Sequence, residues 1–317
     1  MAHRRYLVTG GCGFIGSHLV DRLITGGAGV RVLDDLSTGT RANLHPEAEL
    51  VVGDVADRGA LGESLADVDG CFHLAAIASV ARCQADAPGA HRVNLGASVS
   101  LFDLARPGAL DLPVVYASSA AVYGDNPDLP LAETARTVPF SAYGADKLGC
   151  ELHARAGAHT HGLRATGLRF FNVYGPRQDP SSPYSGVISI FLDRLARGMP
   201  ITVHGDGAQS RDFVAVADVV ALLTRAMDRL HGARDHGGAA PVFNVCTGQA
   251  TSIRELAQTL AQLAGRQPEI RSAPARPGDI RHSLGSPARA SDALGYRPRV
   301  RLAEGLAELA RAAAEAA

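Results

Sequence analysis

Short apolar runs rich in β-branched residues alternate with helical stretches through the first half of the chain. The runs that predict strands are 6–9, 30–33, 50–52, 71–74, 114–117 and 165–170. Strands separated by helices are typical of a parallel sheet that is covered on both faces. A chain of 317 residues, 46% of them hydrophobic, is long enough to bury the core of such a sheet. We therefore predict an α/β fold with a Rossmann-type, doubly wound parallel sheet.

The pattern becomes shorter and less regular after about Phe171. Gly, Pro and Ser crowd residues 175–186. The runs 201–204 and 243–245 predict two further strands. Ser252 and Glu255 have the spacing of a capping box, which predicts a helix that ends near Gly265.

This change of pattern predicts two lobes. We expect the Rossmann domain at 1–171, with later segments of about 212–247 returning to it. We expect a smaller C-terminal α/β lobe at 172–211 and 248–317. The smaller lobe is the expected substrate-binding part.

Charge and cysteine usage limit the partners and the compartment. The formal net charge is −1, which gives no reason to expect nucleic acid or an anionic membrane as a partner. No apolar stretch approaches the roughly 20 residues that span a bilayer, and a strand beginning at Tyr6 leaves no room for a signal peptide. The five cysteines include no Cys-x-x-Cys pair, and the histidines show no ligand spacing. We expect a cytoplasmic protein with reduced thiols and no metal.

A glycine-rich run follows the first predicted strand and leads into a helical pattern. It comprises Gly10, Gly11, Cys12, Gly13, Phe14, Ile15 and Gly16. Glycines let the backbone turn tightly and let a pyrophosphate approach the amides at a helix N-terminus. A glycine-rich run alone also fits an ordinary tight turn.

Acidic residues at the ends of the next two strands make the glycine run more specific. Asp34 lies 18 residues after Gly16, where a carboxylate can accept both hydroxyls of a ribose. Asp34 and Asp35 together would repel a 2′-phosphate, which favours NAD over NADP. Asp54 and Val55, after the third strand, suit an adenine contact. The sequence therefore predicts a site for NAD.

Tyr143 and Lys147 lie one turn apart in a stretch that favours a helix, so their side chains share a face. A free phenol, with a pKa near 10, is a poor base at neutral pH. A cation one turn away favours the phenolate and lowers that pKa. Lys147 is the only lysine of the chain, and the chance that it follows one of the seven tyrosines by four is about 2%. We predict that this pair is catalytic.

Ser118 and Ser119 follow the fifth predicted strand, at the carboxyl edge where α/β enzymes place their sites. A hydroxyl there could donate to a substrate oxygen and relay a proton to Tyr143. Two serines after a strand also fit a plain turn. We predict Ser119 as the third catalytic residue and both serines as substrate contacts.

Together these motifs resemble the extended short-chain dehydrogenase/reductase superfamily, specifically its nucleotide-sugar 4-epimerase branch. The likeness covers nearly the whole chain, and several motifs in one order are more specific than any single motif. Beyond the glycine run and the Tyr143–Lys147 pair, it includes Leu33-Asp-Asp-Leu-Ser37, His73-Leu-Ala-Ala76, Ser118-Ser-Ala-Ala-Val-Tyr-Gly124, Arg169-Phe-Phe-Asn-Val-Tyr-Gly-Pro176, His204-Gly-Asp-Gly207, Ser210-Arg-Asp-Phe213 and Arg276-Pro-Gly-Asp-Ile-Arg-His-Ser283.

The resemblance implies a homodimer through a four-helix bundle and a UDP-sugar as substrate. It implies further cofactor contacts from Ser37, Thr38, Gly39, Leu74, Ala75, Ala76 and Asn94, with Phe170 against the nicotinamide. It implies diphosphate contacts from Asn172, Arg211 and Arg276, uracil contacts from Val187, Thr202 and His204, and a ribose contact from Asp279. Ser283, a small residue at the wall of the sugar pocket, resembles members that admit a 2-acetamido group.

Three readings of the activity stay open. A C4 epimerase would act on UDP-glucose/galactose, UDP-GlcNAc/GalNAc or UDP-glucuronate/galacturonate through a transient 4-keto sugar. A dehydratase or decarboxylase of the same fold usually carries an acidic residue just after Ser119, where this chain has Ala120 and Ala121, and alanine cannot transfer a proton. A non-catalytic NAD-binding regulator would not need Tyr143, Lys147 and Ser119. We therefore expect the epimerase.

Overall fold

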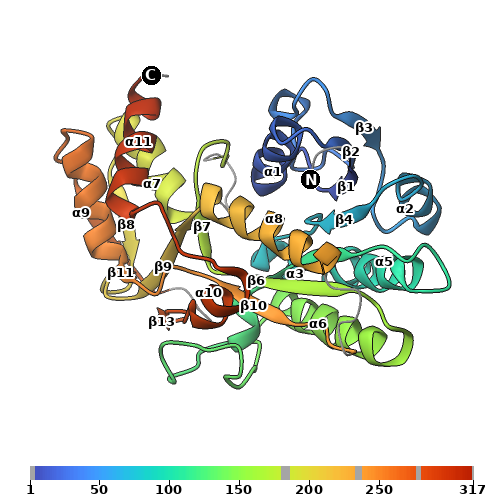
Figure 1. The fold of residues 1–317 in the computed structure, drawn as a ribbon. Coiled ribbons are helices and arrows are strands. Elements are labelled where there is room, and N and C mark those ends of the chain that lie inside the picture. The colour runs from blue at the N-terminus through green and yellow to red at the C-terminus, as the bar shows by residue number, and fades with distance from the viewer. Residues whose placement is uncertain (1–3, 180–185, 233–237, 276–279, 316–317) are drawn as a thin grey trace. The chain divides into compact units, whose positions relative to one another are not determined.

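The computed structural model describes residues 4–179, 186–232, 238–275 and 280–315 (Figure 1). The chain forms two compact units. The first comprises Met1–Tyr123, Pro139–Phe170 and Val220–Phe243, and the second comprises Gly124–Val138, Phe171–Val219 and Asn244–Ala317. The sequence predicts a return to the first lobe from about residue 212, whereas the return in the structure begins at Val220. The assignment of cofactor and substrate to separate lobes stays a prediction.

A seven-stranded sheet has the order β10-β6-β5-β4-β1-β2-β3, and its strands β1 to β6 lie within the first unit, whereas β10 only begins there. Its strands are β1 (Arg5–Thr9), β2 (Gly29–Asp34), β3 (Glu49–Val52), β4 (Gly70–His73), β5 (Val114–Ser119), β6 (Ala165–Phe170) and β10 (Val242–Val245). Neighbours among β1 to β6 pair in parallel. The order 3-2-1-4-5-6 is that of a doubly wound Rossmann sheet, which confirms the predicted fold class.

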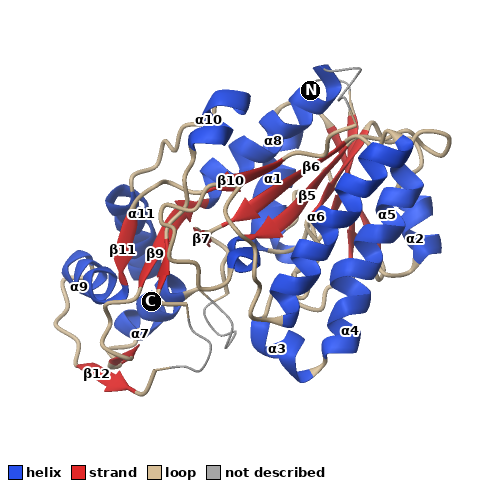
Figure 2. Ribbon diagram, turned by 90° about the horizontal axis from the view of Figure 1, so that it is seen from below, coloured by secondary structure: helices blue, strands red, loops and turns tan. Residues whose placement is uncertain are grey.

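Helices cover both faces of this sheet. Figure 2 shows α2, α5 and α6 on one face and α1 and α8 on the other. The helical elements are α1 (Phe14–Thr25), η1 (Arg41–Asn43), α2 (Arg58–Ser64), α3 (Val80–Ala85), α4 (Ala87–His91), η2 (Arg92–Gly96), α5 (Ala97–Ala105), η3 (Ala120–Tyr123), α6 (Ala142–His161) and α8 (Val216–Gly232). Buried Leu7, Leu61, Leu101 and Cys150 belong to the core under α2, α5 and α6. Within the described ranges, no helix is long and apolar enough to cross a membrane.

Helix α6 is fixed at both ends by local sequence. The hydroxyl oxygen of its N-cap Ser141 accepts a hydrogen bond from Gly144 N at 3.1 Å, and the helix ends at Gly162 in the left-handed region, with φ +72°. A Cβ atom on Gly144 would lie 2.7 Å from Ala121 O. Glycine therefore lets the first turn of α6 lie directly against η3.

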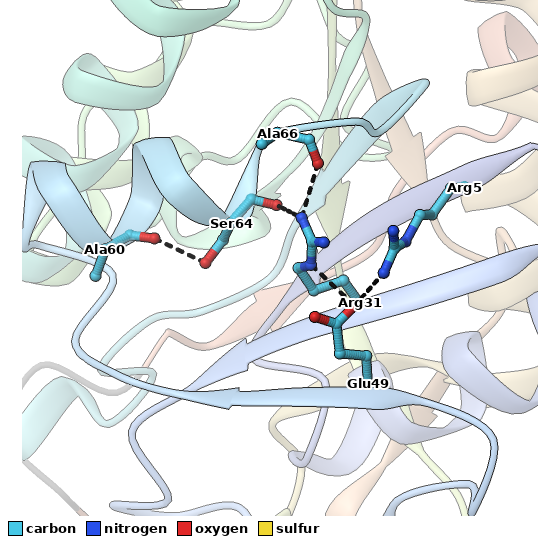
Figure 3. A network of polar contacts seen from close by, with 6 residues as sticks. All are labelled: Arg5, Arg31, Glu49, Ala60, Ser64 and Ala66. Atoms are coloured by element: carbon cyan, nitrogen blue, oxygen red, sulfur yellow. Dashed lines mark hydrogen bonds and ion pairs between the residues drawn. The ribbon is translucent and has the colours of Figure 1, made fainter.

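A polar network fastens the edge strand β3 to its neighbours (Figure 3). Arg31 on β2 donates to Glu49 Oε2 on β3 at 3.1 Å, and Arg5 on β1 pairs with the same carboxylate. The Arg31 guanidinium also donates to Ser64 O at 3.0 Å and Ala66 O at 2.7 Å, just past α2. The network holds the strand whose carboxyl end leads into the predicted adenine site.

The second unit is organised around β9 (Ser210–Ala215), which pairs in parallel with β13 and β7 and antiparallel with β11. A separate parallel pair joins β8 and β12. The remaining elements are β7 (Asn172–Tyr174), α7 (Val187–Ala196), β8 (Ile201–His204), β11 (Ala250–Ser252), α9 (Ile253–Leu263), β12 (Ile270–Ala273), β13 (His282–Ser283), α10 (Ala288–Leu294) and α11 (Leu302–Glu315). Phe191, Leu256 and Leu306 are among the side chains of its own apolar core.

The predicted capping box at the start of α9 is confirmed. The Ser252 hydroxyl oxygen accepts from Glu255 N at 3.1 Å, and Glu255 Oε2 accepts from Ser252 N at 3.0 Å. These bonds satisfy amides that the first turn of a helix leaves open.

Candidate active site

The glycine-rich turn joins β1 to α1 in the first unit. Gly10 has φ +71°, and a Cβ atom on it would lie 2.8 Å from Ala75 N. A Cβ atom on Gly16 would lie 2.1 Å from Gly10 O. Gly13 is the N-cap of α1 and supplies no capping side chain, and Phe14 and Ile15 begin the helix. The first turn of α1 thus offers a backbone surface of the kind that a pyrophosphate binds.

Asp34 ends β2 beside this turn. Its Oδ2 accepts from Cys12 N at 2.9 Å and its Oδ1 from Leu36 N at 2.8 Å. A carboxylate oxygen can accept a second hydrogen bond, so capacity for ribose hydroxyls remains. A Cβ atom on Gly39 would lie 2.8 Å from Cys12 C. The predicted contacts Ser37, Thr38 and Gly39 therefore belong to a segment that lies against the glycine turn.

The loop after β4, which carries the predicted contacts Leu74, Ala75 and Ala76, is bonded to the end of β1. Thr9 Oγ1 accepts from Leu74 N and Ala75 N, each at 3.2 Å. The same hydroxyl lies 2.9 Å from His73 Nδ1, and His73 Nε2 lies 3.0 Å from Ser98 Oγ. Burial lowers the pKa of His73 to about 3, with a smaller contribution from the charge of Lys147. The imidazole is therefore a neutral bridge beneath the turn.

Asn94 lies in the π-helical turn η2, an irregularity frequently found at functional sites. Its Oδ1 accepts from Ile77 N at 2.8 Å and its Nδ2 donates to Ile77 O at 3.2 Å. The same turn carries Arg92, which pairs with Asp54 Oδ2 at 2.8 Å. Burial opposes the charge of Asp54, but a hydrogen bond from Ala56 N and the Arg92 pair outweigh it and lower the pKa of Asp54. Two predicted cofactor contacts thus lie on neighbouring segments, and their role stays a prediction.

The predicted helix over Tyr143 and Lys147 is present as the start of α6. Lys147 Nζ lies 5.8 Å from the centroid of the Tyr143 ring. The ammonium is buried and donates to Ala117 O on β5 at 3.0 Å. Ser119 ends β5, and its Oγ accepts from Ala121 N at 3.1 Å. The register of β5 and β6 sets Ser119 beside Phe170, the predicted nicotinamide contact.

The side chain of Ser118 is buried. Successive residues of a strand point to opposite faces of the sheet, so it points away from the side chain of Ser119. Ser118 Oγ donates to Glu151 Oε1 at 2.5 Å. Glu151 in turn accepts two hydrogen bonds from Arg169, at 2.8 and 2.6 Å. Sequence reasoning gave Glu151 no role, although its position four residues after Lys147 places it on the same helix face. The contact of Ser118 with substrate stays a prediction.

The predicted substrate contacts of the second unit lie on its strands and at the start of α7. Asn172 begins β7, Val187 begins α7, and Thr202 and His204 lie on β8. The pairing of β9 with β13 sets Arg211 beside Ser283. Arg276 and Asp279 lie outside the described residues.

Asp212, which sequence reasoning also passed over, is fully buried next to Arg211. Its Oδ1 accepts from Thr247 N and Thr247 Oγ1, each at 2.7 Å, and its Oδ2 accepts from Gly248 N at 2.9 Å and Gly285 N at 3.4 Å. Burial raises the pKa of Asp212, although these hydrogen bonds oppose the shift. One carboxylate therefore ties β9 to two other segments of the second unit.

Comparisons with known proteins identify the family of the chain. Residues 6–246 match the NAD dependent epimerase/dehydratase family, and the chain belongs to that family. A UDP-glucose 4-epimerase of Mycolicibacterium smegmatis is 40% identical over 312 residues, which cover 96% of each chain. The solved UDP-N-acetylglucosamine 4-epimerase from Methanobrevibacter ruminantium M1, in complex with UDP-N-acetylmuramic acid, has a TM-score of 0.90 at 35% identity and 98% coverage of both chains. The Thermus thermophilus UDP-glucose 4-epimerase in complex with NAD has a TM-score of 0.88 at 34% identity, covering 99% of this chain and 100% of that one.

Proposed function

We propose that this protein is an NAD-dependent isomerase that inverts C4 of a UDP-sugar. The observation that carries the proposal is the buried ammonium of Lys147, 5.8 Å from the Tyr143 ring and bonded to the strand that ends in Ser119. The relatives named above as 4-epimerases match the chain over nearly its whole length and support the same reaction.

The first unit fits NAD. The glycine turn is packed so closely that a Cβ atom on Gly10 or Gly16 would lie within 3 Å of other backbone atoms, which is the tight turn that a pyrophosphate-binding helix start needs. Asp34 retains acceptor capacity for the adenosine ribose. We propose that Tyr143, Lys147 and Phe170 contact the nicotinamide half of NAD. When bound, NAD would supply a reversible hydride acceptor for C4 of the sugar.

Tyr143, Lys147 and Ser119 would handle the proton of the sugar 4-hydroxyl. Tyr143 would accept that proton as the general base, with the Lys147 ammonium 5.8 Å from its ring. Ser119 would hold the same sugar oxygen by a hydrogen bond. Tyr143 would return the proton to the same sugar oxygen at the end of the turnover. The three side chains thus end each turnover in their starting state.

We propose that the second unit binds the nucleotide. Asn172 and Arg211 would hold the diphosphate, since an amide and a guanidinium can orient anionic oxygens. Val187, Thr202 and His204 would line the uracil, and Ser283 would border the sugar. Binding through the remote nucleotide lets the sugar ring turn over without leaving the enzyme.

The test is incubation of the protein, without added cofactor, with UDP-galactose, UDP-GalNAc and UDP-galacturonate, followed by chromatography. Appearance of the C4 isomer of any of them supports the proposal and identifies the sugar. A 4-keto-6-deoxy product or carbon dioxide would instead identify a lyase, although η3 begins with Ala120 and Ala121 and offers no acid there. No turnover of any of the three sugars would contradict the proposed activity and favour a non-catalytic NAD-binding protein.

Replacing the phenol should have the largest effect on turnover. Tyr143→Phe removes the base, and we expect kcat to fall by about 10²–10⁴-fold with NAD still bound. The control is Tyr6→Phe on β1. It removes a phenol hydroxyl that lies 3.3 Å from His231 Nε2. Steady-state kinetics and the cofactor content of both variants give the answer. Near-normal turnover of Tyr143→Phe would contradict the proposed chemistry.

We also propose a homodimer through α5 and α6. A groove of about 250 Å³ lies between these helices, lined among others by Phe102 and Asp103 of α5 and His153 and His161 of α6. Leu152 on α6 is 47% exposed. Light scattering should give twice the chain mass of 32.9 kDa, and Leu152→Glu should lower it toward that of one chain.

We propose the cytoplasm as the compartment. All five cysteines are free thiols in buried positions, and burial raises the pKa of Cys12 to about 11. Reduced, protonated thiols of this kind fit a reducing compartment. Fractionation of cells that produce the protein tests this directly.

A further inference from the structure

Four segments of the first unit meet at one buried ionic cluster. Glu151 on α6 accepts from Ser118 Oγ on β5 and makes a two-pronged pair with Arg169 on β6. Arg169 Nη1 also donates to Tyr123 Oη in η3 at 2.8 Å, and the guanidinium lies 4.8 Å from the centroid of that ring. Glu151 and Arg169 are both more than nine-tenths buried. The cluster therefore lies inside the unit and is closed to bulk solvent.

The carboxylate of Glu151 extends the catalytic face of α6. Tyr143, Lys147 and Glu151 are spaced by four residues, so they lie on one face of the helix in successive turns. Lys147 ties this face to Ala117 on β5, and Glu151 ties it to Ser118, the next residue of the same strand. Two successive turns are thus bonded to the strand that ends in Ser119.

The guanidinium of Arg169 connects the cluster to the segment that follows Ser119. In the β5–β6 register Arg169 lies beside Ser118, and its bond to Tyr123 holds η3, the segment that follows Ser119. Ser119 Oγ itself accepts from Ala121 N in η3. Because Gly144 leaves almost no space between α6 and η3, a small shift of either segment must change the separation of Tyr143 and Ser119.

We propose that Glu151 and Arg169 form a positioning pair that fixes the Tyr143 phenol of α6 relative to the Ser119 hydroxyl of β5, so that both act on one substrate oxygen. This inference rests on the proposed epimerase reaction. Neither residue is assigned a proton-transfer step. Bidentate guanidinium–carboxylate pairs define angle as well as distance, and misplacement of reacting groups by about 1 Å can cost roughly 10²-fold in rate.

The direct test is Glu151→Gln, which keeps the length of the side chain and the acceptor for Ser118 but removes the charge. We expect kcat to fall by about 10- to 100-fold, KM for the UDP-sugar to change by less than about 3-fold, and bound NAD to stay at the wild-type level. The melting temperature should fall by roughly 10 °C, because Arg169 is left buried without its counter-charge.

A double variant separates positioning from stability. Glu151→Gln with Arg169→Met removes both charges and fills the space with an apolar side chain of similar length, which should restore much of the melting temperature. It does not restore the tie between α6, β6 and η3, so kcat should stay at least about 10-fold below wild type. Recovery of both melting temperature and kcat would overturn the inference.

The control is Leu61→Ala, in the core beneath α2, which should lower the melting temperature by a comparable amount. It should leave kcat within about 2-fold at the assay temperature. An equal loss of kcat in Leu61→Ala and Glu151→Gln would overturn the inference, and so would a wild-type kcat in Glu151→Gln. If the wild-type protein converts no UDP-sugar, the proposed function itself falls, and the inference with it.

Discussion

Glu151 of the first unit and Asp212 of the second are buried carboxylates that are compensated differently. In the first unit Glu151 faces the guanidinium of Arg169. In the second, the hydrogen bonds to Asp212 come from three backbone amides and the hydroxyl of Thr247. Burial opposes the charge of Arg169, but the bonds to Glu151 outweigh it and hold the pKa of Arg169 above its usual value. For Asp212 burial prevails and raises the pKa.

The contrast shows two ways to order a site from inside. A charge pair joins secondary structure elements through side chains, as α6 is joined to β5 and β6. A carboxylate surrounded by amides instead shapes loops, because each bond fixes a peptide group of the turn at Thr247 and Gly248. We expect the stability of the first unit to depend on the balance of charge between Glu151 and Arg169. We expect the stability of the second to depend on the hydrogen-bond acceptors that Asp212 supplies.

The largest expected loss of stability in the second unit follows removal of that acceptor. Asp212→Ala leaves buried amides and a hydroxyl without a partner, and we expect it to lower the free energy of unfolding by about 3–5 kcal/mol. Denaturant titration measures the change. The matched control is Asp206→Ala, which removes an exposed carboxylate paired with Arg281 and should leave the free energy nearly unchanged. Similar losses in both variants would show that the buried position of Asp212 gives it no special weight in stability.

A fall in pH should change the contributions of His73 in the first unit and Asp212 in the second to the free energy of unfolding in opposite directions. The pKa of His73 is lowered to about 3 in the folded chain, so between pH 6.5 and 3 the unfolded chain binds a proton that the folded chain refuses. Stability from the first unit should therefore fall with decreasing pH, by about 1.4 kcal/mol per unit of pH through this residue. The raised pKa of Asp212 works the other way, because its burial costs less once it is protonated.

The variant His73→Asn isolates this contribution. An amide can still bond to Thr9 but takes up no proton, so the decline in unfolding free energy between pH 7 and pH 5 should be smaller by about 2 kcal/mol than in the wild type. An unchanged slope would show that another group dominates the acid response.

The smallest effect is expected at the edge of the first sheet. Glu49→Gln weakens the network with Arg5 and Arg31 in Figure 3. The carboxylate is 46% exposed, so solvent screens the pairs and we expect a loss of about 0.5–1 kcal/mol that shrinks at high salt. Turnover should be unchanged. A loss as large as that of Asp212→Ala would mean that half-exposed pairs matter as much as buried groups here.

Local pattern was sufficient for several elements of both units. The strand at 165–170 and the capping box at Ser252 were predicted with their bounds, because each is decided by residues close in sequence. The turn from Gly10 to Gly16 and the spacing of Tyr143 and Lys147 are likewise local signals. The fold class and the family could be predicted because several such local motifs occur in a characteristic order along the chain.

The buried clusters could not be predicted in the same way. Glu151 and Arg169 meet only after α6 packs on β5 and β6, and Asp212 gathers donors from Thr247, Gly248 and Gly285, which lie 35, 36 and 73 residues after it in sequence. A signal was present in one case, because Arg169 is a charged residue inside an apolar strand and such a residue needs a buried partner. The two-residue strand His282–Ser283 carries no periodic pattern, so its pairing with β9 is decided by tertiary structure alone.

The solitary lysine also has a practical consequence. Since Lys147 is the one ε-amine of the chain and is almost wholly shielded, an amine-selective reagent has no competing lysine to modify. The rate at which that single side chain becomes labelled would report how often the seam between α6 and β5 opens, with no need for an engineered probe.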